Sequence, residues 1–143
     1  MTKISWWKTN FGEEEIERVV QSIRHKNVSQ GKVTADFENK LADFLEVEHA
    51  VATSNGSSAL LMSLMAIGIK PGDEVILPNR TWIATAHAIH LLGAKVVLVD
   101  VEKKRPAIDV HQIESKITTN TRAIVPVHMN GRSCDMDKIN QIA

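Results

Sequence analysis

Residues 50–68 constrain the fold more than any other stretch, because a short apolar run passes through a turn of small residues into an apolar helix. The run at residues 50–53 is typical of a short buried strand. Ser-Asn-Gly at residues 54–56 favours a turn, and we expect a helix to begin at Ser57. The stretch therefore predicts a strand–turn–helix unit.

The turn in this unit suits an anion such as a phosphate group. A helix N-terminus carries unpaired backbone N–H groups and a partial positive charge. Gly56 would let a ligand approach the backbone closely, and Ser57 and Ser58 add two hydroxyls. Ser, Asn and Gly are also common as caps and turn formers where no ligand binds. From these residues alone, a phosphate site and a simple helix cap both remain open.

Downstream of this unit, strand and helix patterns alternate. The apolar runs are continuous rather than alternating, which is typical of strands buried on both faces of a parallel sheet. The sequence therefore predicts an α/β fold with a mainly parallel sheet and helices on both faces. The expected strands are residues 74–77, closed by Pro78, then 95–99 and 122–127, and the expected helices are residues 81–92, 110–117 and a last one that starts at Asp135.

Two helices are expected before this alternating region. The first begins at residues 13–15 (Glu-Glu-Glu), acidic residues that suit a first helical turn. The second spans residues 34–46, and Gly31 is the expected hinge in the loop at residues 27–32. Both carry apolar residues at helical spacing, which predicts one buried stripe on each. The predicted stripes are Ile16, Val19, Val20 and Ile23 on the first helix and Phe37, Leu41, Phe44 and Leu45 on the second.

Trp6 and Trp7 place a large apolar area on the N-terminal arm, so we expect the arm to pack on its own domain or on a partner subunit. We interpret the chain as a single partial domain over residues 1–143. It comprises an arm and helices at 1–48 and the βαβ units at 49–143. Because the last expected helix stops at Ala143 after two turns, we expect the chain to be part of a longer protein.

Composition narrows the classes of function. The 143 residues include 17 Lys and Arg and 17 Asp and Glu, so no excess of positive charge indicates nucleic acid or an anionic membrane. A hydrophobic content of 43% is typical of a globular protein. The single Cys134 excludes an internal disulfide framework, and no histidine spacing indicates a metal site. No apolar run reaches the length of a membrane span, so we expect a cytoplasmic protein.

Polar or aromatic residues follow every expected strand. Ligands of open parallel sheets bind beyond the carboxyl ends of the strands. Trp82 could stack on a planar ring there or pack into the core, and His128 could bond a ligand or serve the structure. The dinucleotide fingerprint, the Gly-Lys-Ser/Thr phosphate loop and the Gly-x-Ser-x-Gly elbow are all missing. The polar segments are residues 54–58, 79–82, Asp100 and 128–131.

Several segments, taken in order, resemble the N-terminal part of the pyridoxal-phosphate-dependent sugar aminotransferases of the DegT/StrS type. They are Gln-Gly-Lys-Val-x-x-x-Phe-Glu at 30–38, Ser-Asn-Gly-Ser-Ser-Ala-Leu at 54–60, Pro-Gly-Asp-Glu-Val-Ile at 71–76, Thr-Trp-Ile-Ala-Thr at 81–85 and Pro-Val-His-x-x-Gly at 126–131. The resemblance implies the large domain of a homodimeric fold-type I transferase. Such a transferase moves an amino group, usually from glutamate, onto a nucleotide-linked keto sugar. Surface-polysaccharide or related amino-sugar biosynthesis is the expected role.

The resemblance also implies site residues. Gly56, Ser57 and Ser58 match the turn that holds the cofactor phosphate, and Trp82 matches the aromatic residue that stacks on the pyridine ring. Gly31 and the arm with Trp6 and Trp7 match, less specifically, regions that approach the substrate or the partner subunit. Gly31 and His128 are the candidate substrate-binding residues. Asn130 replaces a frequent Tyr, which leaves the choice of sugar open.

The resemblance leaves the catalytic lysine outside these residues. The family's Schiff-base lysine and its Asp-x-x-Gln pair lie downstream of the residues present, so we assign no catalytic residue and expect the isolated chain to be inactive. We also expect it to self-associate or to need a partner to be soluble, because a parallel sheet without its later strands exposes an edge. The alternatives are a non-catalytic α/β domain that binds a phosphate ligand or a partner, and a plain scaffold.

Overall fold

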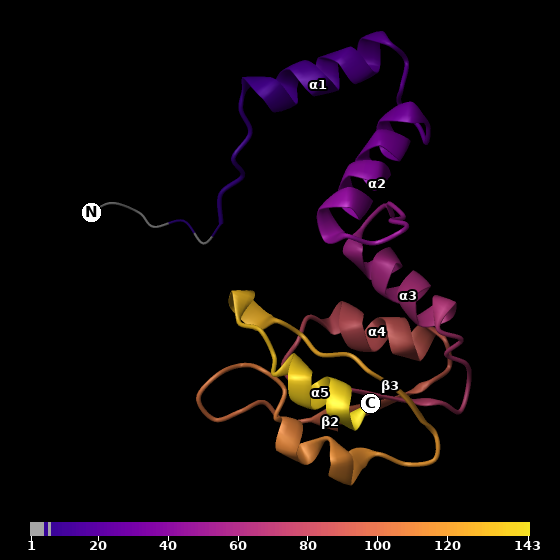
Figure 1. Ribbon diagram of the computed structural model, residues 1–143, viewed down its shortest axis with the longest axis vertical. Coiled ribbons are helices and arrows are strands. Elements are labelled where there is room, and N and C mark those ends of the chain that lie inside the picture. The colour runs from indigo at the N-terminus through magenta and orange to yellow at the C-terminus, as the bar shows by residue number, and fades with distance from the viewer. Residues whose placement is uncertain (1–4, 6) are drawn as a thin grey trace. The chain divides into compact units, whose positions relative to one another are not determined.

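The computed structural model describes residues 5 and 7–143, and the chain divides into two compact units, Met1–Ala52 and Thr53–Ala143 (Figure 1). The prediction for Trp6 lies outside the described residues. Trp7 is 71% exposed, so the expected packing of the arm is not seen at this residue.

The first unit contains two helices, α1 (Glu13–Arg24) and α2 (Lys32–Leu45), and both were predicted. The carboxylate of Glu15 accepts a hydrogen bond from the Gly12 N–H at 2.6 Å, which supports the first turn of α1. This backbone hydrogen bond lowers the pKa of Glu15. Helix α2 starts directly after the expected hinge Gly31, whose backbone is extended, and ends at Glu46 in a left-handed conformation.

The prediction that both helices bury their apolar stripes is wrong for the described residues. On α1, Ile16, Val19 and Ile23 are more than half exposed, and no residue of the helix is buried. On α2, Phe44 is 83% exposed and Ala42 is the buried residue. Helical periodicity shows which face of a helix is apolar, but it does not show what covers that face.

The strand predicted at residues 50–53 is also absent. Val51 is 68% exposed, and the Ala52 N–H donates to the Glu38 carboxylate on α2 at 2.8 Å instead of joining a ladder. An apolar run becomes a strand only when a second strand pairs with it. No described strand does so here.

The second unit confirms the α/β prediction. In chain order it contains α3 (Gly56–Ala66), β1 (Glu74–Pro78), α4 (Ile83–Leu91), β2 (Lys95–Val99), β3 (Thr121–Ile124) and α5 (Met136–Ile142). The strands form one parallel sheet in the order β2-β1-β3. The segment expected to form one short helix at 110–117 forms two short 3₁₀ helices instead, η1 (Val110–Gln112) and η2 (Glu114–Lys116).

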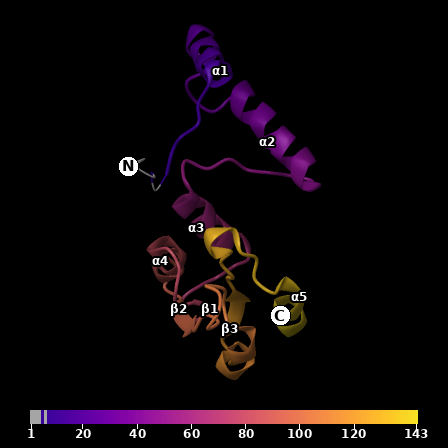
Figure 2. The same cartoon turned by 90° about the vertical axis from the view of Figure 1, so that its left-hand side faces the viewer.

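Helical elements cover both faces of the sheet (Figure 2). Val75 and Leu77 of β1 are fully buried against α3 and α4, whereas Ile76 between them is buried against η1 and α5. The crossover from β1 to β2 and the crossover from β2 to β3 run in opposite directions across the sheet. Right-handed crossovers of opposite direction lie on opposite faces. The chain therefore changes face between β1 and β3, which is where open parallel sheets bind ligands.

Glu74 ties the three strands together at the opposite, amino edge of the sheet. Its buried carboxylate pairs with Lys95 Nζ of β2 at 2.7 Å and accepts a hydrogen bond from the Thr118 hydroxyl, just before β3, at 2.7 Å. These bonds, first that from Lys95 and then that from Thr118, lower the pKa of Glu74. The amino edge thus has a structural role, and the carboxyl edge remains for a ligand.

Within the described part of the chain, every helix is too short or too polar to cross a lipid bilayer.

Candidate functional site

The first turn of α3 presents donors that the protein itself does not use. Asn55 is the N-cap, and its side-chain oxygen accepts the Ser58 N–H at 2.9 Å. Gly56 and Ser57 are the first two residues of α3, and their N–H groups donate no hydrogen bond to any described residue. The positive end of the helix therefore carries two free backbone donors side by side.

An open hollow of about 590 Å³ lies where the N-terminal turns of α3 and α4 meet. Gly56, Ser57 and Trp82, which the sequence predicted to belong to one site, all line this hollow. Ser58 does not line it. The lining residues are Gly56, Ser57, Ala59, Leu60 and Ser63 from α3, and Trp82, Ala84 and Thr85 from the start of α4.

The serine hydroxyls around this turn differ in what they already bind. Ser63 Oγ donates to the Ala59 carbonyl at 2.8 Å, so its bond is made within the helix. Ser58 Oγ lies 3.5 Å from Ser54 Oγ. For Ser57 Oγ, no hydrogen-bond partner occurs in the part of the chain that the structure describes. Ser57 is therefore the hydroxyl in the hollow that is available to a ligand.

Gly56 leaves space that no protein atom fills. A Cβ built on this residue meets nothing within 4 Å, and its backbone is not in the left-handed region. Neither a turn conformation nor close packing of the protein therefore requires glycine here. Gly56 is also one of the residues that line the hollow, so the hollow has a backbone without a side chain on its wall.

Trp82 is the N-cap of α4 and is 78% exposed, so the alternative that it packs into the core is wrong. Its neighbour Thr81 shares a hydroxyl–hydroxyl contact of 2.9 Å with the buried Thr85. Thr85 in turn lines the hollow. The aromatic ring thus lies open to solvent at the rim of the same hollow as the donors of α3.

Two other residues of the polar rim, Asn79 and Asp100, are bonded to each other. The Asn79 N–H donates to the Val99 carbonyl at 2.8 Å, and the Asn79 side-chain amide donates to the Asp100 carboxylate. These bonds join the chain after β1 to the chain after β2. They hold the two strand ends together, as parallel neighbours require.

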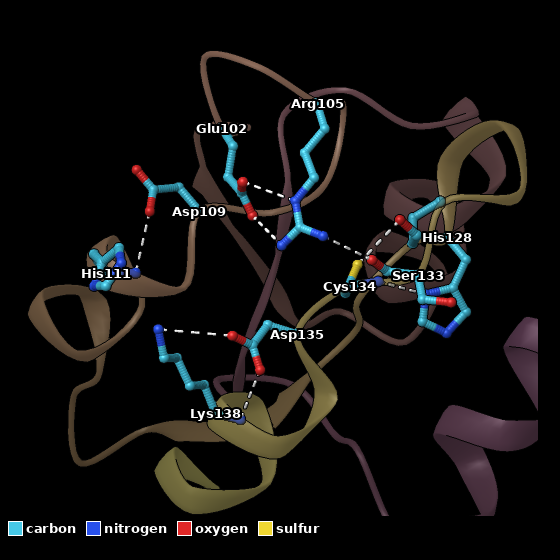
Figure 3. A network of polar contacts seen from close by, with 10 residues as sticks. Glu102, Arg105, Asp109, His111, His128, Ser133, Cys134, Asp135 and Lys138 are labelled. Carbon is cyan, nitrogen blue, oxygen red and sulfur yellow. Dashed lines mark hydrogen bonds and ion pairs between the residues drawn. The ribbon is translucent and has the colours of Figure 1, made fainter.

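His128 lies at the carboxyl end of β3 and is exposed, but one side of its ring is already bound. Its Nδ1 accepts the Cys134 N–H at 3.1 Å, and Cys134 Sγ donates to the Val127 carbonyl at 3.3 Å (Figure 3). His128 does not line the hollow beside Trp82. Gly31 belongs to the first unit, and it is not among the residues that line the hollow.

Sequence reasoning missed Thr85 and Ala84, which line the hollow from α4, and the role of Asn55 as N-cap. Asn55 could have been found, since Asn directly before a helix is a strong capping signal. Thr85 carries no such signal, because its exposure to the hollow depends on how α3 packs on α4.

Comparisons with known proteins agree on one family. A family model described as the DegT/DnrJ/EryC1/StrS aminotransferase family matches residues 9–143. GDP-perosamine synthase of Caulobacter vibrioides is 45% identical over 115 residues, which make up 80% of this chain and 31% of that protein.

Solved structures agree with this similarity. The PLP form of the putative sugar aminotransferase Spr1654 from Streptococcus pneumoniae matches 99% of this chain with a TM-score of 0.94 at 30% identity. The aminotransferase from Psychrobacter cryohalolentis matches 99% of it with a TM-score of 0.92 at 34% identity. In both cases the match covers 36% of the other chain, so this chain spans about a third of the length of its relatives.

Proposed function

The chain belongs to the DegT/DnrJ/EryC1/StrS aminotransferase family, and we propose that it forms the phosphate-holding part of the cofactor site of a pyridoxal-phosphate-dependent sugar aminotransferase. The family predicted from the motifs is thereby confirmed, and relatives of this chain are known in PLP and PMP forms. The observation that carries the proposal is the first turn of α3, where free donors and a residue without a side chain line one hollow.

The residues of this turn fit a phosphate group. The N–H groups of Gly56 and Ser57 and the Ser57 hydroxyl would donate to its oxygens, at the end of a helix whose dipole favours negative charge. Gly56 would leave room for the close approach. Ser58 would contribute less than the sequence suggested, because its N–H is already bonded to Asn55.

Trp82 fits the planar ring of the cofactor. Its exposed indole would stack on the pyridine, and the apolar part of the hollow would keep water from that side of the ring. When bound, pyridoxal phosphate supplies an electron sink for the substrate carbon whose amino group is transferred. The part of the site proposed here therefore binds and orients the cofactor and leaves proton transfer to other groups.

We propose no catalytic lysine in this chain. Lys138 follows Ser133 at the spacing of the family's Ser-x-x-x-x-Lys segment, so it is the lysine to test against this view. Lys138 belongs to α5, and its Nζ lies 3.7 Å from the carboxylate of Asp135, the N-cap of that helix. Helix α5 packs on the face of the sheet opposite α3. Lys138 is thus unsuited to reach the hollow, and the isolated chain is expected to give no transamination.

The substrate and setting follow the resemblance. The similarity to GDP-perosamine synthase supports a nucleotide-linked sugar as substrate. A keto group on that sugar as amino acceptor, and glutamate as the amino donor, are proposed from the family resemblance alone. A cytoplasmic homodimer that serves polysaccharide or related amino-sugar biosynthesis completes the proposal. These points rest on relatives about three times as long as this chain.

Calorimetric titration of the 143-residue chain with pyridoxal phosphate and with inorganic phosphate tests the proposal. Ser57→Ala is expected to weaken the binding of both ligands, because each contains the phosphate. Trp82→Ala is expected to weaken pyridoxal phosphate alone. Ser63→Ala is the matched control, since that hydroxyl lines the hollow but is bonded to Ala59. If Ser57→Ala and Ser63→Ala lost the same amount of affinity for pyridoxal phosphate, the assignment of Ser57 to the phosphate site would be contradicted.

A further inference from the structure

A single peptide group joins His128 to an ion pair on another loop. The Ser133 carbonyl accepts a hydrogen bond from Arg105 Nη1 at 3.3 Å, and the Cys134 N–H donates to His128 Nδ1 at 3.1 Å (Figure 3). These two groups belong to the same peptide bond, which is planar. The orientation that Arg105 imposes on the carbonyl is therefore also imposed on the N–H that meets the imidazole.

Arg105 is itself held in place. Glu102 binds it through two contacts, Nη2–Oε1 at 2.7 Å and Nε–Oε2 at 2.8 Å, the bidentate geometry of a strong Arg–carboxylate pair. The hydrogen bond from Arg105 lowers the pKa of Glu102, so the pair stays charged at neutral pH. Both side chains are partly shielded, at 39% and 28% exposure, which limits screening by solvent.

The other end of the peptide group is anchored in the core. Cys134 is 5% exposed, belongs to the cluster around Ile76 and Ile139, and donates its thiol to the Val127 carbonyl at 3.3 Å. The peptide between Ser133 and Cys134 is thus fixed from both sides. A carbonyl bonded to a guanidinium cation also polarises its own N–H, which strengthens the bond to His128.

This bond decides which nitrogen of His128 carries the proton. Because Nδ1 accepts a hydrogen bond, the neutral ring must carry its hydrogen on Nε2. Among the described residues, no acceptor meets Nε2, and the side chain is exposed at the carboxyl end of β3. The ring therefore offers a donor at the edge of the sheet where ligands bind.

We infer that Arg105, through the Ser133–Cys134 peptide, is a positioning residue that fixes His128 as the Nε2–H tautomer, so that His128 donates a hydrogen bond to an acceptor oxygen of the bound substrate. The substrate oxygen rests on the proposed function, but the tautomer and its dependence on Arg105 do not. The Glu102–Arg105 pair holds this donor although neither side chain lines the hollow beside Trp82.

The test is nitrogen-15 NMR of the histidine rings of the full chain, without cofactor or substrate, above the pH at which the imidazole is neutral. Unliganded wild-type protein is expected to show His128 as one tautomer with the proton on Nε2. A proton on Nδ1, or an averaged ring with both tautomers, would overturn the inference at once, whatever the variants do.

The variants test the part played by Arg105. Arg105→Ala is expected to abolish the single tautomer and to speed hydrogen exchange of the Cys134 amide about tenfold, the loss expected for a charge-assisted bond. Arg105→Lys keeps the positive charge but loses the planar guanidinium that binds Glu102 through two contacts. It should therefore restore the single Nε2–H tautomer of His128 only in part. Arg18→Ala, which removes the exposed Arg18–Glu14 pair of α1, is the matched control and should change neither signal.

An unchanged tautomer in a folded Arg105→Ala protein would refute the positioning role. Should that variant not fold, Glu102→Gln gives a milder form of the test, because it keeps the guanidinium but removes the carboxylate charge that orients it toward Ser133. Failure of the calorimetric test with pyridoxal phosphate would leave these NMR results untouched, so the two proposals can fail separately.

Discussion

Replacing Gly56 by Ala is expected to stabilise the protein and weaken its ligand binding at the same time. Gly56 is the first residue of α3, its backbone is not left-handed, and an added Cβ meets no protein atom within 4 Å. Alanine therefore fits without strain. It should raise the free energy of unfolding by up to about 1 kcal/mol, the difference between Gly and Ala in a helix.

The same methyl group would occupy the space next to the two free N–H donors. Forcing one extra carbon into a fitted contact costs about 1–3 kcal/mol, which corresponds to a loss of affinity for pyridoxal phosphate of about 5- to 150-fold. Urea unfolding measures the first effect and calorimetric titration the second. A Gly56→Ala protein that binds pyridoxal phosphate as tightly as wild type would refute the claim that the phosphate approaches the backbone at this residue.

Three further predictions concern the scaffold. The hydrogen bond from Lys95 lowers the pKa of Glu74, so the carboxylate stabilises the fold above its ordinary pKa of 4.5, and this contribution is lost as the pH falls through the lower folded value. In urea unfolding at a series of pH values, the free energy of unfolding should therefore fall less steeply with acid in Glu74→Gln than in wild type. Ile76→Ala should lower the free energy of unfolding by about 2–5 kcal/mol and the half-exposed Leu98→Ala by clearly less. Asn55→Ala should cost about 0.5–2 kcal/mol by thermal unfolding, through loss of the cap.

Two of the three strands of the sheet could be predicted closely from the sequence, whereas the strand expected at 122–127 is the shorter β3, Thr121–Ile124. The strand expected at 95–99 has the observed bounds of β2, and the strand expected at 74–77 differs from β1 only by Pro78. In β1 the local pattern and the tertiary structure agree, because this apolar run is buried from both faces of the sheet. Strand β2 lies at the edge of the three-stranded sheet, and Leu98 in it is half-exposed although the run is apolar. The parallel pairing then follows from the helical pattern between them.

The segments that depend on distant partners could not be predicted as well. Residues 50–53 have the composition of a strand, but pairing is a property of two segments, and the Ala52 N–H bonds to Glu38 instead. The apolar residues of α1 and α2 do fall at helical spacing, as predicted, yet Phe44 is exposed. The spacing shows which residues share a face of the helix, but it does not show whether another segment covers that face. Residues 110–117 form two 3₁₀ helices. This could not be predicted, because the local sequence pattern alone does not distinguish two short 3₁₀ helices from one continuous helix.

The candidate site shows the same division. Gly56, Ser57 and Trp82 could be identified because turn residues and an aromatic residue follow predicted strands, and the structure places them around one hollow. The availability of Ser57 and the reduced availability of Ser58 depend on the cap made by Asn55, a geometric detail. The contact between Arg105 and Ser133 joins residues 28 positions apart, and no local pattern indicates it.

The most direct test of the central claim is an amide proton–nitrogen NMR titration of the full chain with pyridoxal phosphate, compared with pyridoxal, which lacks the phosphate. The account predicts that the Gly56 and Ser57 amide signals move with pyridoxal phosphate and much less with pyridoxal. Equal shifts with both ligands, or shifts confined to residues away from the first turn of α3, would contradict it.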